Sequence, residues 1–482
     1  MQLNRTTANV EKRPIKVLQF GEGNFLRAFI DWMIHEMNVK ADFNAGVAVV
    51  QPIPQGLGEL LSSQDGLYHL YLNGIEKGQL INKKMLVDCI QSVVNPYEDY
   101  NAYLQLAEEE ELKFVFSNTT EAGITYKAGD AKDKVQDSFP AKLTAFLNHR
   151  FEHFKGDASK GLIILPCELI DKNGVKLKEI ILKYAADWGL SDDFKTWLDS
   201  ACTFYNTLVD RIVPGYPKDR IKEIHEELGF EDQLVVEGEQ FHLMVMEGDQ
   251  SIKEVLPFEK AGLNIIVTDN QAPYRTRKVR ILNGAHTLMV PVGLLAGIET
   301  VRENVENEQV GKFVDDAVTL EVIPSLPSAE GLVEFKEDVM DRFRNPFIQH
   351  YLKSIALNSF PKFNTRVLPS ITSFIEKEGK VPSHLLMSFA ALIKLYDPKN
   401  PVGFKPQDNQ DVVELLSTVW EEYRSEYFSI DQLVEKVLAY KNVWGQDLNQ
   451  LPLLKEELSV YLRVIDADGG VHSYFSENVI NS

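Results

Sequence analysis

The chain has 482 residues, a length that predicts two or three domains rather than one small core. Hydrophobic residues make up 44% of it and charged residues 25%, as in an ordinary globular protein. The formal net charge of -21 argues against a nucleic-acid partner and against an anionic membrane surface, because both require a basic patch.

Cysteine usage and hydropathy indicate the compartment. The three cysteines, Cys89, Cys167 and Cys202, are widely spaced and form no C-x-x-C pair, which is typical of a reducing environment and gives no metal signature. The chain begins without an apolar signal core, and its longest apolar run, residues 288 to 298, is too short to cross a bilayer. The sequence therefore predicts a soluble, cytoplasmic protein without a bound metal.

The first predicted element is a short buried strand, residues 15 to 20, that runs directly into a glycine turn and a helix. Nucleotide-binding folds have this order of strand, turn and helix. Gly21 permits the tight turn, and Gly23 lets backbone N–H groups approach a pyrophosphate at the start of the helix. Leu26 stands where the fingerprint has its third glycine, so the pattern alone leaves an ordinary turn as an alternative.

The second predicted strand, residues 46 to 50, lies where a parallel sheet places it after one crossover helix. An acidic residue at its end would bind the ribose hydroxyls of NAD, but the sequence has Gln51 there. The choice between NAD and NADP therefore stays open. A further strand is expected over residues 87 to 94.

Two later strands end in polar residues. Residues 114 to 117 form an apolar strand followed by Asn118 and Thr119, and such strand ends line the cofactor crevice of a doubly wound sheet. An ordinary polar turn is the alternative at this point. Residues 161 to 165 form another strand, and the polar turn after it leads to Asn173 at the start of a helix. Asn173 is expected either to cap that helix or to donate to a substrate oxygen.

After residue 270 the pattern changes to long helical periodicities with few strand signals. The predicted architecture is an α/β Rossmann-like domain with a mostly parallel sheet, residues 1 to 269, followed by a predominantly α-helical domain, residues 270 to 482. A cation-bearing loop, residues 359 to 369 with Lys362 and Arg366, is expected within the second domain. The helices expected there cover residues 275 to 297, 329 to 343, 346 to 357, 383 to 396, 410 to 425, 430 to 441 and 449 to 464.

Three polar side chains interrupt the first of these helices, namely Lys278, Asn283 and His286. At about 100° per residue they fall within roughly 140° of one another, so all three can face one site. Carbonyl–alcohol interconversion requires a group that exchanges the hydroxyl proton and donors that hold the developing oxyanion, and these side chains can supply both. Spacing alone leaves the alternative of an amphipathic helix with a surface lysine and a capping asparagine.

With these segments in place, the chain resembles the mannitol dehydrogenase family of polyol-specific long-chain dehydrogenases over nearly its whole length. The motifs that carry the resemblance are the K-x4-N-x2-H element that starts at Lys278, the opening turn at residues 21 to 28, and the V-D-R-I-x-P segment at residues 209 to 214. The resemblance implies an NAD-binding Rossmann domain, a largely helical C-terminal domain, no catalytic metal and a site between the two domains.

The resemblance also implies roles for individual residues. Lys278 would be the catalytic acid/base and His286 would orient the substrate, while Asn173 and Asn283 would form the oxyanion clamp. The expected cofactor-binding residues are Gly21, Gly23, Asn24, Phe25, Arg27, Asn118 and Thr119.

Departures from the family pattern bear on the substrate. Polyol-specific members carry an arginine eight residues before the lysine that matches Lys362, whereas this chain has Ser354 there. The segments that resemble the tagaturonate reductase branch of the family are residues 117 to 124, 165 to 174 and 342 to 348. That branch reduces a keto-hexuronate, and Lys362 and Arg366 are the expected partners of its carboxylate. A solvated loop is the alternative for this pair.

The function expected from the resemblance is therefore the NAD-dependent reduction of D-tagaturonate to D-altronate, with a small-molecule substrate as the partner. Fructuronate, or an uncharged pair such as fructose and mannitol, is an alternative within the same chemistry. A nucleotide-binding regulator that has lost catalysis is an alternative of a different class. The intact Lys278, Asn283 and His286 speak against it, because a site without catalysis has no reason to keep all three.

Overall fold

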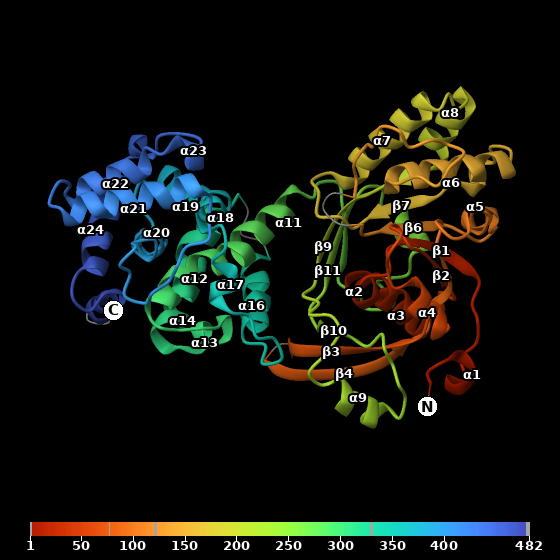
Figure 1. Ribbon diagram of the computed structural model, residues 1–482, viewed down its shortest axis with the longest axis horizontal. Coiled ribbons are helices and arrows are strands. Elements are labelled where there is room, and N and C mark those ends of the chain that lie inside the picture. The colour runs from red at the N-terminus through yellow and green to blue at the C-terminus, as the bar shows by residue number, and fades with distance from the viewer. Residues whose placement is uncertain (1, 77, 120–122, 328–330, 479–482) are drawn as a thin grey trace. The chain divides into compact units, whose positions relative to one another are not determined.

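The computed structural model describes residues 2–76, 78–119, 123–327 and 331–478, and the chain forms two compact units (Figure 1). Unit 1 consists of residues 1–73 and 80–271, and unit 2 consists of residues 74–79 and 272–482. Within the described ranges, no helix combines the length and the apolar composition that crossing a membrane requires.

Unit 1 is built around a six-stranded sheet with the order β5-β2-β1-β6-β7-β8. Its strands are β1 (Ile15–Phe20), β2 (Gly46–Val50), β5 (Ile90–Val94), β6 (Phe114–Ser117), β7 (Ile163–Pro166) and β8 (Thr203–Phe204). All neighbouring pairs run parallel. This is the doubly wound order of dinucleotide-binding folds, and the direction of winding reverses between β1 and β6. The predicted Rossmann-like architecture is confirmed.

Two apolar cores lie on opposite faces of this sheet, because alternate residues of a strand point to opposite sides. Val47 and Val49 of β2 belong to one core, which also contains residues of helix α3 (Trp32–Ala41). Ala48 and Val50 belong to the other core. The helices that cover this second face are α6 (Phe139–His153), α7 (Asn173–Asp187) and α8 (Asp192–Ala201) (Figure 1). Burial on both faces explains why the strands are continuous apolar runs in the sequence.

Two smaller sheets have the orders β10-β3-β4 and β12-β11-β9. Their strands are β3 (Tyr68–Glu76), β4 (Gln79–Val87), β9 (Asn206–Asp210), β10 (Val236–Glu239), β11 (Leu243–Glu247) and β12 (Ile265–Thr268). The strand predicted over residues 87 to 94 is confirmed for residues 90 to 94 and wrong at its start, because β4 ends at Val87 and β5 begins at Ile90. Between them the Asp88 carboxylate pairs with Arg13 at 2.9 Å and with His35 at 3.0 Å.

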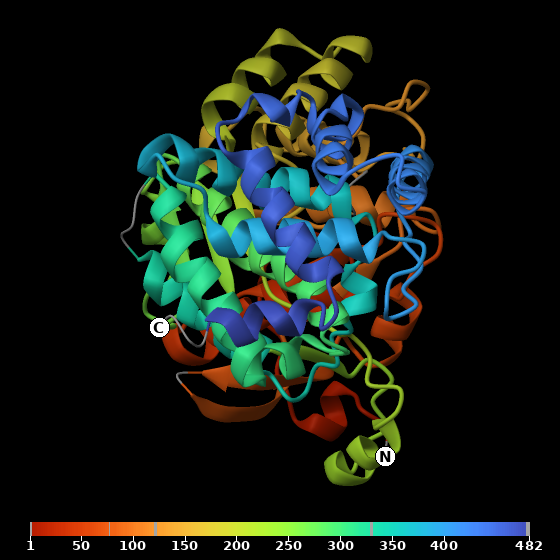
Figure 2. The ribbon, with the colours of Figure 1, turned by 90° about the vertical axis from the view of Figure 1, so that its left-hand side faces the viewer.

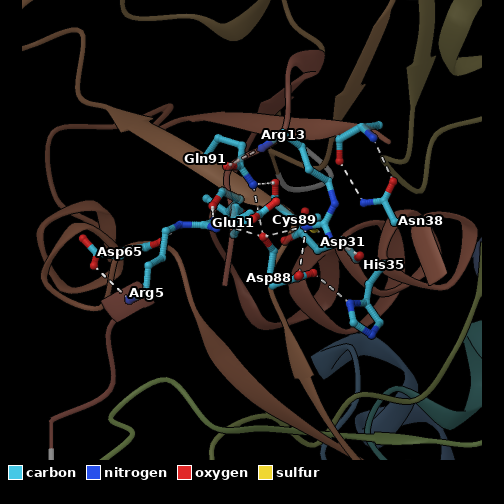
Figure 3. Close-up of polar contacts among 12 residues, drawn as sticks. Arg5, Glu11, Arg13, Asp31, His35, Asn38, Asp65, Asp88, Cys89 and Gln91 are labelled. Carbon is cyan, nitrogen blue, oxygen red and sulfur yellow. Dashed lines mark hydrogen bonds and ion pairs between the residues drawn. The ribbon is translucent and has the colours of Figure 1, made fainter. Parts of the chain in front are cut away.

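The N-terminal segment is held to unit 1 by Arg5, which lies in the short helix α1 (Arg5–Ala8) (Figure 3). The Arg5 guanidinium donates to the carbonyl oxygens of Glu11, Asp65, Asp88 and Ile90. Because Arg5 is buried, these partners and the nearby Asp88 carboxylate offset the cost of removing its charge from water.

From Ala272 on, the regular elements that the structure describes are helices, coloured green to blue in Figure 2. A continuous helical run opens this part with α11 (Ala272–Arg277), η4 (Lys278–Asn283) and α12 (Gly284–Leu295). Every residue of α12 is buried, as expected for a helix that is apolar on all sides. The other predicted helices that the structure confirms are α16 (Leu332–Phe343), α20 (Ser383–Leu395), α21 (Gln410–Arg424), α22 (Ile430–Leu438) and α24 (Leu454–Asp466). Further helices include α13 (Val301–Glu306), α14 (Glu308–Asp316), η5 (Ala317–Val322) and α25 (Val471–Asn478).

The helix predicted over residues 346 to 357 is wrong in its extent, because only α17 (Leu352–Ile355) is helical there. Pro346 disfavours a helical backbone at Asn345. The carbonyl oxygen of His350 accepts from the Val301 N–H at 2.9 Å, so the end of the segment before α17 is bonded to another part of unit 2.

The loop predicted over residues 359 to 369 is also wrong, because this stretch belongs to α18 (Ser359–Arg366) and to the start of α19 (Leu368–Glu378). Both Pro361 and Pro369 stand in the first turn of a helix, where the missing N–H costs nothing.

Candidate active site

The glycine turn lies at the end of β1, where the order of the sheet reverses. Gly21 has a φ of +119°, and an added Cβ would stand 3.0 Å from the Asn118 carbonyl oxygen. Gly23 has an ordinary φ of -70° and precedes helix α2 (Asn24–Leu26). No described atom lies within 4 Å of the place where its Cβ would be. The backbone therefore requires glycine at position 21, whereas at position 23 glycine leaves open space beside the start of the helix.

Arg27 holds this turn from inside unit 1. Its Nε donates to the Glu22 carbonyl oxygen at 3.2 Å and its Nη2 to Asn24 Oδ1 at 2.7 Å, while Nη1 donates to the Leu234 carbonyl oxygen. The side chain is buried, and burial lowers the pKa of the guanidinium. Predicted as a cofactor-binding residue, Arg27 is placed to shape the turn through bonds to the protein.

Phe25, which the sequence also assigned to the cofactor, lies on the same turn. Its ring is stacked on that of Phe29 with 5.0 Å between the centroids. Phe29 belongs to the short π-helix η1 (Arg27–Asp31), which joins α2 to α3. Stacking of the two rings fixes the orientation of the first helical turn.

Asn118 and Thr119, at the end of β6, are bonded to the end of β7. The Asn118 amide donates to the Cys167 carbonyl oxygen at 2.9 Å. The Thr119 N–H and hydroxyl both donate to Glu168 Oε1, at 3.0 and 2.9 Å, and the Ser117 hydroxyl donates to Oε2 at 3.0 Å. Residues 120–122, which follow, lie outside the described residues.

Glu168 is the residue of this edge that sequence reasoning missed. It is 2% exposed, and burial raises the pKa of its carboxyl group. The only signal in the sequence was a single acid directly after an apolar strand. In the structure it fixes the end of β6 to the end of β7.

Gln51 stands where a dinucleotide-binding fold places an acid, but its side chain is directed to its own loop. Its amide donates to the carbonyl oxygens of Ile53 and Pro54 at 2.9 and 3.0 Å. Its Oε1 accepts from the Gly58 N–H at 3.0 Å. Gln51 therefore shapes residues 51–58.

Asn173 is the first residue of α7 rather than its N-cap, and it is 0% exposed. Its amide donates to the carbonyl oxygens of Pro166 and Glu168 at 2.9 and 3.1 Å. It also donates to Thr207, and its Oδ1 accepts from the Gly174 and Thr207 N–H groups. Both amide protons are used inside unit 1, so this side chain joins β7, α7 and β9.

The lysine and the asparagine of the motif in unit 2 lie at the two ends of one π-helical segment, η4 (Lys278–Asn283). The sequence analysis assumed an α-helix here. A π turn is wider and pairs residues i and i+5, so Lys278 and Asn283, five residues apart, come closer to one face than in an α-helix. Both residues are half-buried. Short π segments inside α-helices occur frequently at functional sites.

His286 lies one turn further on, in α12, and is 9% exposed. Its ring lies against Phe343, 4.3 Å between centroids, and edge-on against His350, 5.0 Å away at 72°. Its Nε2 has no hydrogen-bond partner among the described atoms. Burial lowers the pKa of His286 well below its usual value, and His350, Arg342 and Arg366 lower it further. His286 is therefore a neutral imidazole with one ring nitrogen left for a ligand.

Lys362 and Arg366 lie on α18 four residues apart, on one face of that helix. The Lys362 ammonium donates to the Ile355 carbonyl oxygen at 2.9 Å, and Arg366 Nη1 lies 3.5 Å from the Thr287 hydroxyl oxygen. Burial lowers the pKa of both, and the charge of Arg366 lowers that of Lys362 further. An added Cβ at Gly284 would stand 3.3 Å from the Arg366 carbonyl oxygen, so α18 packs directly on the junction of η4 and α12.

Unit 2 thus brings together one lysine, one amide, one imidazole and a cationic helix face, whereas Asn173, Asn118 and Thr119 belong to unit 1. Sequence reasoning gave no role to Arg342, which opens the segment 342 to 348, and missed His350, because the bend at Pro346 hid its position. Among the residues that the structure describes, no group of three or more His, Cys, Asp or Glu could hold a metal ion.

Comparison with known proteins covers both units. Residues 15–260 match the model of the mannitol dehydrogenase Rossmann domain, and residues 270–465 match that of the mannitol dehydrogenase C-terminal domain. Altronate oxidoreductase of Bacillus subtilis is 47% identical over 453 residues, which cover 94% of this chain and 93% of that protein. Altronate oxidoreductase of Bacteroides thetaiotaomicron is 44% identical over 475 residues, with 97% and 98% covered.

Solved structures show the same fold at low sequence identity. Substrate-free D-sorbitol dehydrogenase is similar with a TM-score of 0.80 at 20% identity, over 98% of this chain and 100% of that one. The ternary complex of Pseudomonas fluorescens mannitol 2-dehydrogenase with NAD and D-mannitol is similar with a TM-score of 0.65 at 20% identity, over 100% of both chains.

Proposed function

The chain belongs to the mannitol dehydrogenase family, whose members are oxidoreductases acting on CH–OH groups with a nicotinamide nucleotide, and we propose from this premise that it reduces D-tagaturonate to D-altronate with NADH. Relatives at 42–47% identity named altronate oxidoreductase support this choice of substrate. The substrate would be a small keto-hexuronate.

One observation carries the catalytic part of the proposal. Lys278 and Asn283 lie at the two ends of a π turn, and one turn later His286 keeps a buried Nε2 without a partner among the described atoms. A fold gains no stability from an unpaired buried nitrogen, so its retention favours a ligand as the missing partner.

The chemistry follows from these three side chains. Bound NADH supplies the hydride that reduces the ketone carbon. The Lys278 ammonium gives its proton to the ketone oxygen, so that an N–H bond breaks as the O–H bond forms. Asn283 donates to the same oxygen while negative charge develops there, an interaction worth roughly 3 to 4 kcal/mol in the transition state. His286 orients the substrate through Nε2.

Cofactor binding is assigned to the glycine turn of unit 1. We assign the pyrophosphate to the backbone of residues 21 to 24, at the start of α2, where N–H groups and open space meet. Asn118 and Thr119 would line the adjoining strand end. Arg27 and Phe25 would support the turn, since their side chains are bonded or stacked within unit 1.

The substrate carboxylate is assigned to the cationic face of α18. Arg366 offers the planar pair of donors that suits a carboxylate, and Lys362 adds a second positive charge. Asn173, whose amide protons are used within unit 1, is assigned a positioning role at the end of β7 in place of a role in the oxyanion clamp.

The test is turnover of NADH and NADPH by the purified protein with D-tagaturonate, D-fructuronate and D-fructose at equal concentrations. Oxidation of NADH confined to tagaturonate is expected. Preference for fructuronate would move the substrate within the same acid class, and preference for fructose would remove the carboxylate from the assignment. No turnover with any of the three would overturn the proposed function.

A further inference from the structure

The histidine pair of unit 2 contains one member that the proposed function does not use. His350 lies in the bent segment before α17 and packs edge-on against His286, with 5.0 Å between the ring centroids. Its backbone carbonyl is fixed by the Val301 N–H at 2.9 Å, so the position of the ring does not depend on a helix of its own. The pair therefore has a defined geometry.

The charged and titratable groups that lower the pKa of His286 are all bases. The groups that act on His286 come from three segments: Arg342 at the end of α16, Arg366 on α18, and His350 itself. Two acids interact with members of this cluster, Asp338 with Arg342 and Asp408 with Lys362. A half-buried cluster of bases around an unpaired nitrogen is stabilised by an anion that enters it.

We propose that His350 is a specificity-determining residue, which binds the substrate carboxylate together with Arg366 and takes up one proton from solvent as the carboxylate binds. This inference rests on the proposed function, because it needs an anionic substrate. His350 would add an imidazole donor to the cations of α18. Its positive charge would form when the anion binds.

The direction of the effect follows from the surroundings of His350. In the free protein, burial lowers the pKa of His350, so the ring is neutral near pH 7. A carboxylate within hydrogen-bond distance stabilises the imidazolium and raises that pKa. Binding therefore consumes protons in the pH range between the two pKa values, and the affinity for an anionic ligand rises as the pH falls through that range.

The test uses D-altronate and the protein saturated with NADH, a combination in which both partners are reduced and no turnover occurs. Titration calorimetry in buffers of different protonation enthalpy gives the affinity and the number of protons taken up. Wild-type protein is expected to take up a measurable fraction of a proton below pH 7. His350→Gln, which keeps a donor but cannot titrate, is expected to bind about tenfold more weakly and to lose this uptake.

Controls separate binding from folding. His472→Gln makes the same chemical change at an exposed position on α25 and should leave both quantities unchanged. If circular dichroism shows that His350→Gln is unfolded, His350→Asn replaces it. Unchanged affinity and uptake in a folded His350 variant would overturn the inference, as would a wild-type protein that binds altronate without proton uptake. Both results leave tagaturonate reduction intact, whereas a wild-type protein that does not reduce tagaturonate removes both proposals.

Discussion

The glycine turn of unit 1 and the His286 region of unit 2 differ in how far the protein itself satisfies their polar side chains. At the turn, the side chains of Arg27 and Asn118 are bonded to the protein itself. In unit 2, His286 keeps a buried nitrogen without a partner among the described atoms and stands in a cluster of bases. The difference indicates that the two units recognise their ligands in two different ways.

A cofactor bound by backbone N–H groups needs a rigid turn, and the side chains around that turn are used to build it. A reacting substrate needs at least one polar atom that the fold leaves available, and His286 Nε2 bonds to no described atom. A buried polar group left unpaired costs roughly 1 to 3 kcal/mol, a cost that a bound ligand or water recovers. The site residues of unit 2 are therefore those whose loss should change rate more than stability.

The largest effect is expected for Lys278→Ala. Removal of the group that supplies the proton should lower kcat about a hundredfold to ten-thousandfold, because general acid catalysis contributes that much. NADH binding and the melting temperature should stay near wild type. Lys399→Ala, at an exposed position of unit 2, is the matched control. Turnover within a few-fold of wild type would remove Lys278 from the mechanism.

The two asparagines test the comparison directly. Asn283→Ala should reduce kcat about a hundredfold to a thousandfold with little change in stability, because it removes one oxyanion donor. Asn173→Ala removes a buried amide that satisfies several backbone groups and should lower the free energy of unfolding by about 3 kcal/mol. Urea unfolding and steady-state kinetics on both variants separate the effects. A stable Asn173→Ala protein with a large loss of kcat would return Asn173 to the oxyanion clamp.

Much of the fold could be predicted because its signals are local. Gly21 after the strand at residues 15 to 20 fixes the place of the turn, and apolar runs buried on both faces identify parallel strands. Prolines are a less local signal, because their effect depends on their position within a helix. Pro361 and Pro369 start helices instead of breaking them, a distinction that depends on where the preceding helix ends.

The placement of Lys278, Asn283 and His286 in one helical run could be predicted, since their spacing in sequence needs no tertiary information. The π turn could not be predicted, because it depends on how η4 packs against α16, α18 and η5. The role of Asn173 was also hidden, since its partner Thr207 lies 34 residues away in sequence. His350 contacts His286 because the chain bends before α17. A helical pattern in the sequence does not predict that bend.

A smaller effect is expected for Arg366→Lys. This change keeps the charge and removes the planar pair of donors, so KM for D-tagaturonate should rise about tenfold while kcat changes little. Arg302→Lys is the control, because Arg302 is exposed and pairs with Glu306 at 2.9 Å on the surface of α13. A fall in kcat with unchanged KM would place Arg366 near the reacting atoms, and equal effects in both variants would leave α18 without a role in carboxylate binding.

The smallest effects separate the two glycines of the turn. Gly21→Ala forces a Cβ into a backbone with φ of +119° and should lower the free energy of unfolding by about 1 to 3 kcal/mol. Gly23→Ala has an ordinary φ of -70° and open space, so it should fold as stably as wild type. Its methyl group would still fill the space through which the backbone approaches a pyrophosphate, so NADH affinity should fall about tenfold in a fluorescence titration. Wild-type affinity in Gly23→Ala would mean that the cofactor is held by side chains in unit 1 as well, and the contrast with unit 2 would then rest on His286 alone.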